Sequence, residues 1–406
     1  GFVFPEFYDE VAVDEKKKNE DELTEVKNII GYMWCDEVGR PFREGTIPYN
    51  QEMLYAIFKF NARAKNKTCK FKVIHKESRK TIFSHKFTVS KIQHLFKFDI
   101  KKLFDICNDL ISSFIINVEV DNEKFSNEKR KKLSDPILDK NIESEQILKI
   151  HYVIFIPSIM KKLKWKESLR FQELWFKGLK NDYPWENYPV LNYYSFEWAL
   201  KFKRFEEVYK ANEDAWKNDK AIPQLREEIK KMVDLGYAHL PNNVNKITRF
   251  GREINDSMMI EVWKKREELD NKEAPEMMPL FEKFYFQSVE FDNGFYPKVD
   301  NLTGAVGNCN IRFTAIGTLE YINDQKTIAT ITELGVYIRD SFDFVNDQPL
   351  GFWSKVDSDV TKYGGKSYKY IENEDYRNYS KATGFGMNFY TYSTMKVLKP
   401  NYQFEL

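Results

Sequence analysis

Two carboxylates, Asp340 and Asp343, lie three residues apart in the segment 339–344 (RDSFDF), where an apolar strand pattern ends. If the strand stops near Asp340, a turn could bring both side chains to one rim; if it continues, they point to opposite faces. A close pair could act as a general acid and base, or could share Mg²⁺ or Ca²⁺. The commoner role for such side chains is to cap a turn through backbone N–H groups. The sequence leaves these three interpretations open.

Arg377 is the cation best placed to join this pair, because it shortly precedes a glycine turn at 383–386 (TGFG). It could pair with either aspartate or clamp a phosphate, although a surface ion pair is the commoner role of an arginine. The predicted catalytic residues are therefore Asp340, Asp343 and Arg377. Three further carboxylates have no spacing that places them near this rim: Glu290, Asp292 and Asp300.

Other catalytic signatures are missing from the sequence. The five histidines all precede the C-terminal strand region: His75, His85, His94, His151 and His239. There is no HExxH, GxSxG, GxxxxGK or GxGxxG motif. The four cysteines form no CxxC pair, so we expect buried thiols rather than a metal cluster or a redox motif. The chain could thus be an enzyme or a non-enzymatic binding protein.

Composition excludes several classes of protein. The 406 residues are 42% hydrophobic and 31% charged, as in a globular chain of two or three domains. Lys+Arg (63) and Asp+Glu (62) balance, which disfavours general nucleic-acid binding. No apolar run approaches the roughly 20 residues of a membrane helix. The opening residues Gly1 to Pro5 lack a Sec signal pattern, so we expect export to use another route.

The first part of the chain is predicted to be a β-sandwich. Residues 1–28 form a charged arm, and short strand-like runs follow at 31–35, 53–60, 69–74, 81–89 and 114–120. Residues 101–109 are predicted to form a helical insert in this module, which spans 29–120. The segment 121–146 is charged, contains Pro136 and offers few groups for burial, so it is predicted to be a linker.

An α+β domain is predicted over 147–406. Apolar spacing indicates helices at 157–177, 196–209, 225–233 and 259–269, within a helical part 157–270. The remainder, 283–406, is predicted to be antiparallel and β-rich. Its best-defined hairpin pairs 310–321 with 328–338 around Asp324 and Gln325, which places Ile311 opposite Ile338. The same register places Phe313 opposite Val336 and Tyr321 opposite Ile328.

Ordered motifs across about 150–393 resemble an uncharacterised bacterial domain family associated with type VI secretion. They comprise IPSIM at 156–160, Trp165, LWF at 174–176, GVY at 335–337, DSFDF at 340–344, Gln348, LGFW at 350–353, Asn373, Arg377, Tyr379 and TGFG at 383–386. The β-rich front is similar to the immunoglobulin-like modules that precede toxin domains in such proteins. A fainter likeness connects the Asp340–Asp343 motif with colicin M, although colicin M needs a later His–Arg pair and no histidine follows His239 here.

The resemblance implies an antibacterial effector whose C-terminal domain is toxic, acting on the cell envelope. Its implied partners are type VI delivery components and a cognate immunity protein, and it would be made in the producer's cytoplasm and secreted into target cells. The alternative is a non-enzymatic adaptor or structural cargo carrier of the same secretion system. Neither the substrate nor the immunity partner can be inferred from these residues.

Overall fold

The computed structural model describes residues 28–128, 147–181, 188–251, 279–294 and 297–406. They form two compact units. Unit 1 comprises Gly1–Ile159 and Leu350–Gly386, and unit 2 comprises Met160–Pro349 and Met387–Leu406. The predicted α+β class is confirmed, since helices accompany several antiparallel sheets and the N-terminal region is rich in strands. Residues 1–27 of the predicted arm, most of the predicted linker and the predicted helix 259–269 fall outside the described residues.

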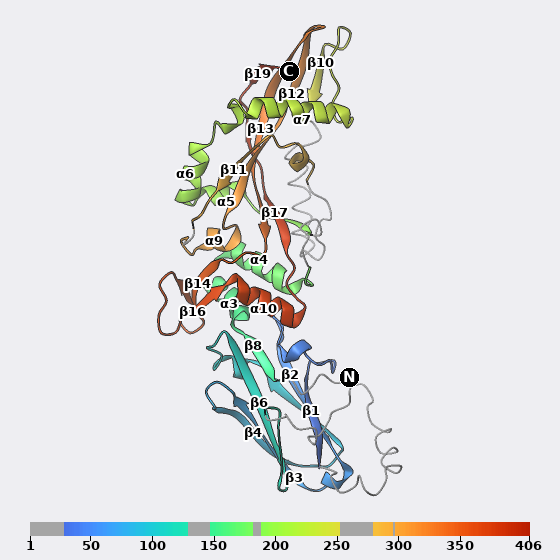
Figure 1. Cartoon of the computed structure of the whole chain (residues 1–406), viewed down its shortest axis with the longest axis vertical. Helices are drawn as coiled ribbons and strands as arrows, with labels where there is room; N and C mark the ends of the chain where they lie inside the picture. The colour runs from blue at the N-terminus through green and yellow to red at the C-terminus, as the bar shows by residue number, and fades with distance from the viewer. Residues whose placement is uncertain (1–27, 129–146, 182–187, 252–278, 295–296) are drawn as a thin grey trace. The chain divides into compact units, whose positions relative to one another are not determined.

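Besides a three-stranded sheet in residues 349–372, unit 1 contains two sheets built from neighbouring segments nearer the N-terminus (Figure 1). One has the strand order β1-β2-β5 and the other β4-β3-β6-β7, with β8 also paired to β6. The bounds are β1 Ile29–Cys35, β2 Met53–Phe60, β3 Thr68–His75, β4 Thr81–Thr88, β5 Gln93–Asp99, β6 Ile111–Val120, β7 Glu123–Ser126 and β8 Leu148–His151. Strand β5 was not predicted, and β7 lies inside the predicted linker. The helical insert is the short α2, Lys101–Phe104.

Aromatic side chains join the two sheets of unit 1. The ring of Phe58 on β2 lies 4.8 Å from that of Phe71 on β3, and Phe71 lies 5.1 Å from Phe96 on β5. Both Phe58 and Phe71 are completely buried. The two sheets therefore pack face to face as a sandwich, with aromatic rings in contact across the space between them.

The returning segment Leu350–Gly386 belongs to unit 1, whereas the sequence pattern places it in the C-terminal domain. It holds β14 Pro349–Ser354, β15 Asp359–Thr361, β16 Lys369–Glu372 and α10 Asn373–Thr383. The buried Tyr152 of η5 (Tyr152–Phe155) donates a hydrogen bond to the Trp353 carbonyl and accepts one from the Lys355 N–H. The Tyr379 hydroxyl accepts another from the Tyr49 N–H, at 2.8 Å. These tyrosines tie the segment to the front of the chain.

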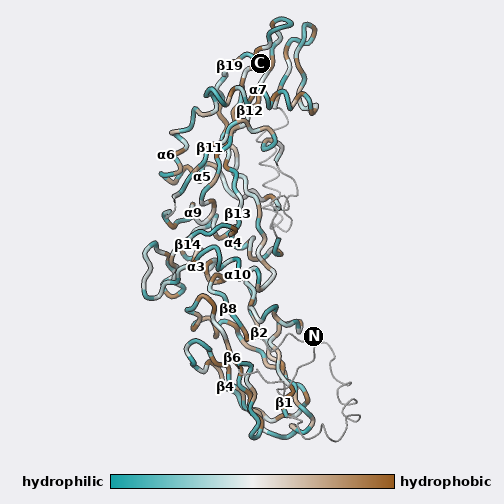
Figure 2. Tube along the Cα trace, viewed as in Figure 1, coloured by the Kyte–Doolittle hydropathy of each residue, from teal (hydrophilic) through white to brown (hydrophobic). Residues whose placement is uncertain are grey.

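Unit 2 is organised around one large sheet. Its order is β10-β12-β13-β17-β9, with β11 paired to β12 and with β18 and β19 paired to β13; only the β9–β17 pair is parallel. The bounds are β9 Val190–Tyr194, β10 Ile247–Phe250, β11 Gln287–Phe291, β12 Cys309–Asn323, β13 Lys326–Phe342, β17 Phe389–Ser393, β18 Lys396–Leu398 and β19 Tyr402–Glu405. Hydrophilic and hydrophobic stretches alternate along the chain in both units (Figure 2).

Three of the predicted helices are present, but the predicted helices 157–177 and 196–209 are each divided into two shorter ones. They are α3 Ile156–Lys162, α4 Lys166–Lys177, α5 Phe196–Leu200, α6 Lys203–Ala211 and α7 Ala221–Asp234. The short α9, Asn301–Ala305, was not predicted and lies in the part expected to be β-rich. The predicted helix 157–177 breaks near Lys164, whose φ of 61° is left-handed and ends α3. Gly178 follows α4 and Gly236, with φ 79°, follows α7, as expected of helix-terminating glycines.

The β12–β13 hairpin confirms the predicted pairing at its open end and corrects it near the turn. Ile311 faces Ile338 and Phe313 faces Val336, and the turn centres on Asp324 and Gln325. Tyr321, however, faces Thr327 rather than Ile328, because the register shifts between Ile316 and Gly317. The β-bulge exchanges the two faces of β13, so that Ala329 and Ile331 are buried in place of Ile328.

Candidate functional site

Strand β13 continues through Asp340, so this aspartate lies within the sheet rather than at a strand exit. Asp340 pairs with Thr391 of β17, and its carboxyl group acts electrostatically on the thiol of Cys309, the first residue of β12. By strand alternation its side chain shares a face with Ile338 and with Phe342, which packs against Phe171 of α4 at 5.7 Å between ring centroids. The carboxyl group therefore projects toward the apolar core face of unit 2.

The environment of Asp340 favours a protonated carboxyl. The residue retains partial exposure, yet burial is the largest cause that raises its pKa well above the ordinary value. The neighbouring Asp343 raises this pKa further, while the Ser341 N–H and the Arg339 charge lower it. The same carboxyl contributes, after burial, to the raised pKa values of the buried Cys309 and Tyr194. Asp340 thus lies among groups that share its preference for the protonated form.

Asp343 follows β13 and combines features of a site residue and of a turn cap. Burial raises its pKa, and hydrogen bonds from the Val345 N–H and the Ser341 side chain lower it. The Val345 contact to Oδ1 is long, at 3.5 Å. The other carboxylate oxygen, Oδ2, is buried and has no hydrogen-bond partner. A buried orphan oxygen is costly for a fold, so Asp343 is more than a satisfied cap.

The structure brings together two of the three predicted site residues. Asp340 and Asp343 interact within unit 2, whereas Arg377 belongs to α10 of unit 1. The cation that acts on both carboxylates is Arg339, the residue before Asp340, which lowers the pKa of each. Among the described residues, no group of three or more His, Cys, Asp or Glu side chains is placed to hold a metal ion.

The spare carboxylates and the glycine and tryptophan motifs have local roles. The Asp292 side chain accepts a hydrogen bond from the Gly294 N–H, and Glu290 is exposed on β11. The Trp353 indole donates to the Leu350 carbonyl at 2.8 Å, which anchors its own loop. Gly384 ends α10 with φ 75°, so the predicted glycine turn is a helix cap. All four cysteines are buried, as predicted.

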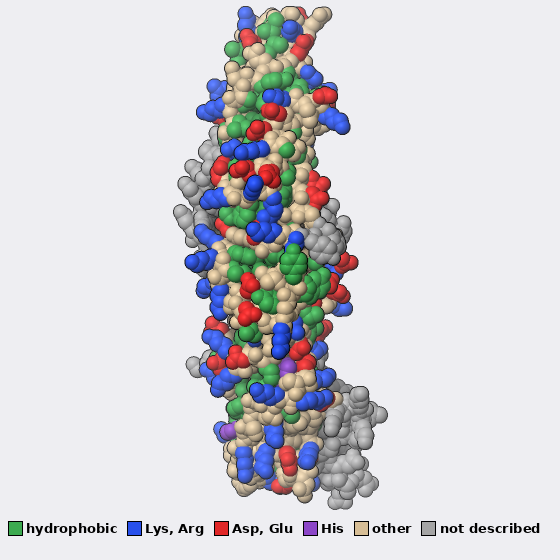
Figure 3. All heavy atoms as spheres, turned by 90° about the vertical axis from the view of Figure 1, so that its left-hand side faces the viewer, with side chains coloured by type: hydrophobic (Ala, Val, Ile, Leu, Met, Phe, Trp, Pro, Cys, Tyr) green, Lys and Arg blue, Asp and Glu red, His purple; other side chains and the backbone are tan. Residues whose placement is uncertain are grey.

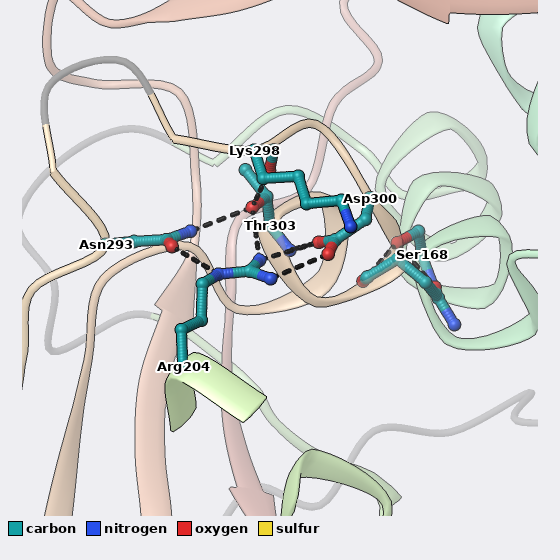
Figure 4. Close-up of polar contacts among 7 residues, drawn as sticks. Ser168, Arg204, Asn293, Lys298, Asp300 and Thr303 are labelled. Carbon is teal, nitrogen blue, oxygen red and sulfur yellow. Dashed lines mark hydrogen bonds and ion pairs between the residues drawn. The ribbon is translucent and has the colours of Figure 1, made fainter. Parts of the chain in front are cut away.

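Asp300 belongs to a polar cluster around Arg204 of α6 (Figure 4). The guanidinium binds both Asp300 oxygens at 2.7 Å and also donates to Asn293 Oδ1 and Thr303 Oγ1. Asp300 caps α9 through the Thr303 N–H. Ser168 of α4 joins the next residue of α9, Asn301, through three hydrogen bonds. The main polar groups of this cluster form hydrogen bonds with one another. We therefore interpret the cluster as structural and call it a clamp, because it holds α4, α6 and α9 together.

Arg204→Met is expected to lower the free energy of unfolding by about 2–3 kcal/mol. The substitution leaves the largely buried Asp300 without its two-pronged partner, which costs more than the lost attraction alone. Lys203→Met is the matched control, because Lys203 pairs with Glu207 on the exposed side of the same helix and should change stability by less than about 0.5 kcal/mol. Urea unfolding of both variants compares them; equal midpoints would refute the clamp.

A second charged group lies on the opposite face of the sheet and was not predicted from the sequence. It consists of Glu282 from η9 (Leu280–Phe284), Arg312 from β12 and Arg339 from β13. The Glu282 side chain is 4% exposed and accepts hydrogen bonds from Arg312 and from the Tyr337 hydroxyl. A carboxylate flanked by Phe281 and Phe284 is the sequence signal that could have indicated a buried, paired acid.

These features define an α+β protein with a half-buried acidic pair at the end of β13, whose Asp340 lies on one face of the main sheet, and an arginine–glutamate group on the other face. The chain belongs to the family of unknown function DUF6402, which residues 152–364 match. No curated protein and no solved structure matches it. Side chains of both charges are interspersed over the face in Figure 3. None of the helices in the described ranges is both long and apolar enough to span a membrane.

Proposed function

We propose that this chain is an antibacterial effector of a type VI secretion system, whose toxic part is the C-terminal α+β domain. The observation that carries the proposal is the acidic pair: Asp340 is directed toward the core face with its pKa raised, and Asp343 has an orphan buried oxygen. Strongly perturbed carboxyls of this kind are concentrated at functional sites. The ordered secretion-associated motifs supply the biological context, and the family match includes both aspartates.

The chemistry best suited to this pair is general acid–base catalysis. Of two neighbouring carboxyls, the one with the higher pKa keeps a proton near neutral pH and the other accepts one. Asp340 would be the acid, since burial and the proximity of Asp343 both favour its neutral form. The likeness to colicin M suggests a component of the cell envelope as the substrate.

The N-terminal sandwich would be the delivery module. Its immunoglobulin-like character and its position before the toxic domain support docking to secretion components, and a cognate immunity protein would protect the producing cell. The alternative function is a non-enzymatic adaptor or cargo carrier. The Val345 N–H contact to Asp343 favours this alternative, because it gives the aspartate a turn-capping role.

Expression of the whole chain in a sensitive bacterium, separately in the cytoplasm and with a periplasmic signal, tests the proposal. We expect growth to stop in the periplasmic arm, where an envelope substrate is accessible. Growth equal to the empty-vector strain in both compartments would refute the toxin. A pull-down from the producing bacterium separates the alternative, since an adaptor should retain a separate effector and a toxin a small immunity protein.

A further inference from the structure

The arginine–glutamate group on the second face of the unit 2 sheet has a surplus of positive charge. Arg312 faces Tyr337 across β12 and β13, and Arg339 faces Tyr392 across β13 and β17. One carboxylate, Glu282, serves both arginines. The side chains of Arg312 and Arg339 are only 14% and 19% exposed. Two guanidinium groups against one carboxylate leave a net charge of about +1 at a site where solvent screens poorly.

The hydrogen-bond donors of this group also outnumber its acceptors. Glu282 accepts from Arg312 Nη1 but lies 3.9 Å from Arg339 Nε, which is an ion-pair contact without a hydrogen bond. The Nε atoms of both arginines are buried without a hydrogen-bond partner. The hydroxyl of the fully buried Tyr392 interacts with the Arg339 side chain, which can only donate, so no acceptor is placed for the hydroxyl's own proton. Three donor groups therefore lack an acceptor, and buried unpaired donors are costly unless something binds them.

Two tyrosine rings orient the guanidinium groups. The Tyr285 ring lies 4.1 Å from the Arg312 guanidinium carbon and the Tyr390 ring 4.6 Å from that of Arg339. Such stacking fixes the guanidinium planes and leaves their N–H edges for other partners. Burial raises the pKa of Tyr392, and the Arg339 charge, a hydrogen bond from the Arg339 side chain and the Arg312 charge oppose that rise, so both arginines act on the same hydroxyl. Tyr392 thus belongs to the arginine group.

We propose that Arg312, Arg339 and the Tyr392 hydroxyl bind a phosphate group, either free phosphate or the phosphate of a larger ligand. Arginine forks match phosphate geometry, and a phosphate offers three acceptor oxygens to the three unpaired donor groups, whereas a carboxylate offers two. A bound dianion also offsets the surplus positive charge. This site lies on the opposite face from Asp340 and does not depend on the toxin proposal.

Titration calorimetry of the whole chain with inorganic phosphate and with phenyl phosphate, at constant ionic strength in chloride, tests the site. We expect saturable one-to-one binding. Tyr392→Phe, which removes only the hydroxyl, should weaken it about tenfold, and Arg339→Gln about a hundredfold, as lost charge-assisted hydrogen bonds do. Tighter binding of phenyl phosphate would identify a phosphate ester as the ligand, and equal binding free phosphate.

The control is Arg249→Gln, which removes the same charge from an exposed position on β10 of the same sheet and should leave the affinity unchanged. Thermal melts verify that each variant is folded, and Tyr392→Phe retains every ring contact of the parent. No saturable binding by the unaltered chain would overturn the proposal. So would an affinity that Tyr392→Phe and Arg339→Gln leave at the parent value, or one that Arg249→Gln reduces equally. None of these readouts depends on toxicity.

Discussion

Asp340→Asn is expected to reduce killing at least about a hundredfold while leaving the protein folded, because general acid–base groups contribute two to four orders of magnitude. The amide has nearly the shape of the neutral acid but cannot release a proton. Stability should not fall at neutral pH, since the raised pKa of Asp340 means that its ionised form is poorly tolerated in the fold. Killing assays and thermal melts on the same preparation measure the two effects.

The pH dependence of the melting temperature provides a second test of the raised pKa of Asp340. A carboxyl whose pKa is raised by folding binds more protons in the folded state than in the unfolded state. Its contribution to stability is complete below the ordinary value of 3.8 and is lost as pH rises from there toward the folded pKa. We therefore expect the melting temperature of Asp340→Asn, relative to the parent, to improve as pH rises from about 4 to 7.

Asp324→Asn, at the exposed tip of the same hairpin, is the control and should preserve both killing and the pH profile.

Asp343→Asn distinguishes a site residue from a cap. Loss of a cap lowers stability by about 0.5–2 kcal/mol and killing only in proportion. A destabilised Asp340→Asn protein that still kills would refute the site.

Gly317→Ala is expected to destabilise unit 2 by about 3 kcal/mol or more, at the upper end for overpacked cores. Gly317 is buried at the β-bulge of the long hairpin. An added Cβ would lie 1.9 Å from the Thr330 carbonyl oxygen and 2.7 Å from the Phe250 ring. Since the first of these is a backbone atom in a paired strand, the clash can be relieved only by moving the strand. Denaturant unfolding measures the loss.

Gly335→Ala is the matched control on the partner strand. Its Cβ would meet the Met395 sulfur at 2.2 Å, but that contact belongs to a flexible side chain that can rotate away. We expect a loss of about 1 kcal/mol. If the two variants unfold at the same denaturant concentration, the backbone clash is not the reason for glycine at 317.

The hairpin illustrates how far apolar patterning predicts a fold. Alternation over 310–315 and 334–338 gave the correct partners because a one-residue slip there would expose an entire apolar face. Nearer the turn the pattern is weak, and the register depends on the bulge beside Gly317. A glycine within a strand indicates such a bulge, but alternation alone does not reveal it.

The candidate site shows that contacts between segments far apart in the sequence are harder to predict than local ones. Asp340 and Asp343 could be identified because their spacing is local. The sequence does not indicate that Arg339 is the cation acting on them, because neighbouring residues of a strand point to opposite faces, nor that the later helix with Arg377 belongs to the other unit. Glu282 meets Arg312 and Arg339 only through pairing between distant segments, which hydrophobic periodicity does not encode.

The return of Leu350–Gly386 to unit 1 has a genetic consequence. The polypeptide passes between the units three times, after Ile159, Pro349 and Gly386. A single recombination breakpoint therefore cannot transfer unit 2 intact: it would remove β17–β19 from their sheet or bring α10 without its Tyr49 partner. Exchange of unit 2 between such proteins would need two further junctions, so relatives are expected to inherit both units together, with variation confined to substitutions and loops.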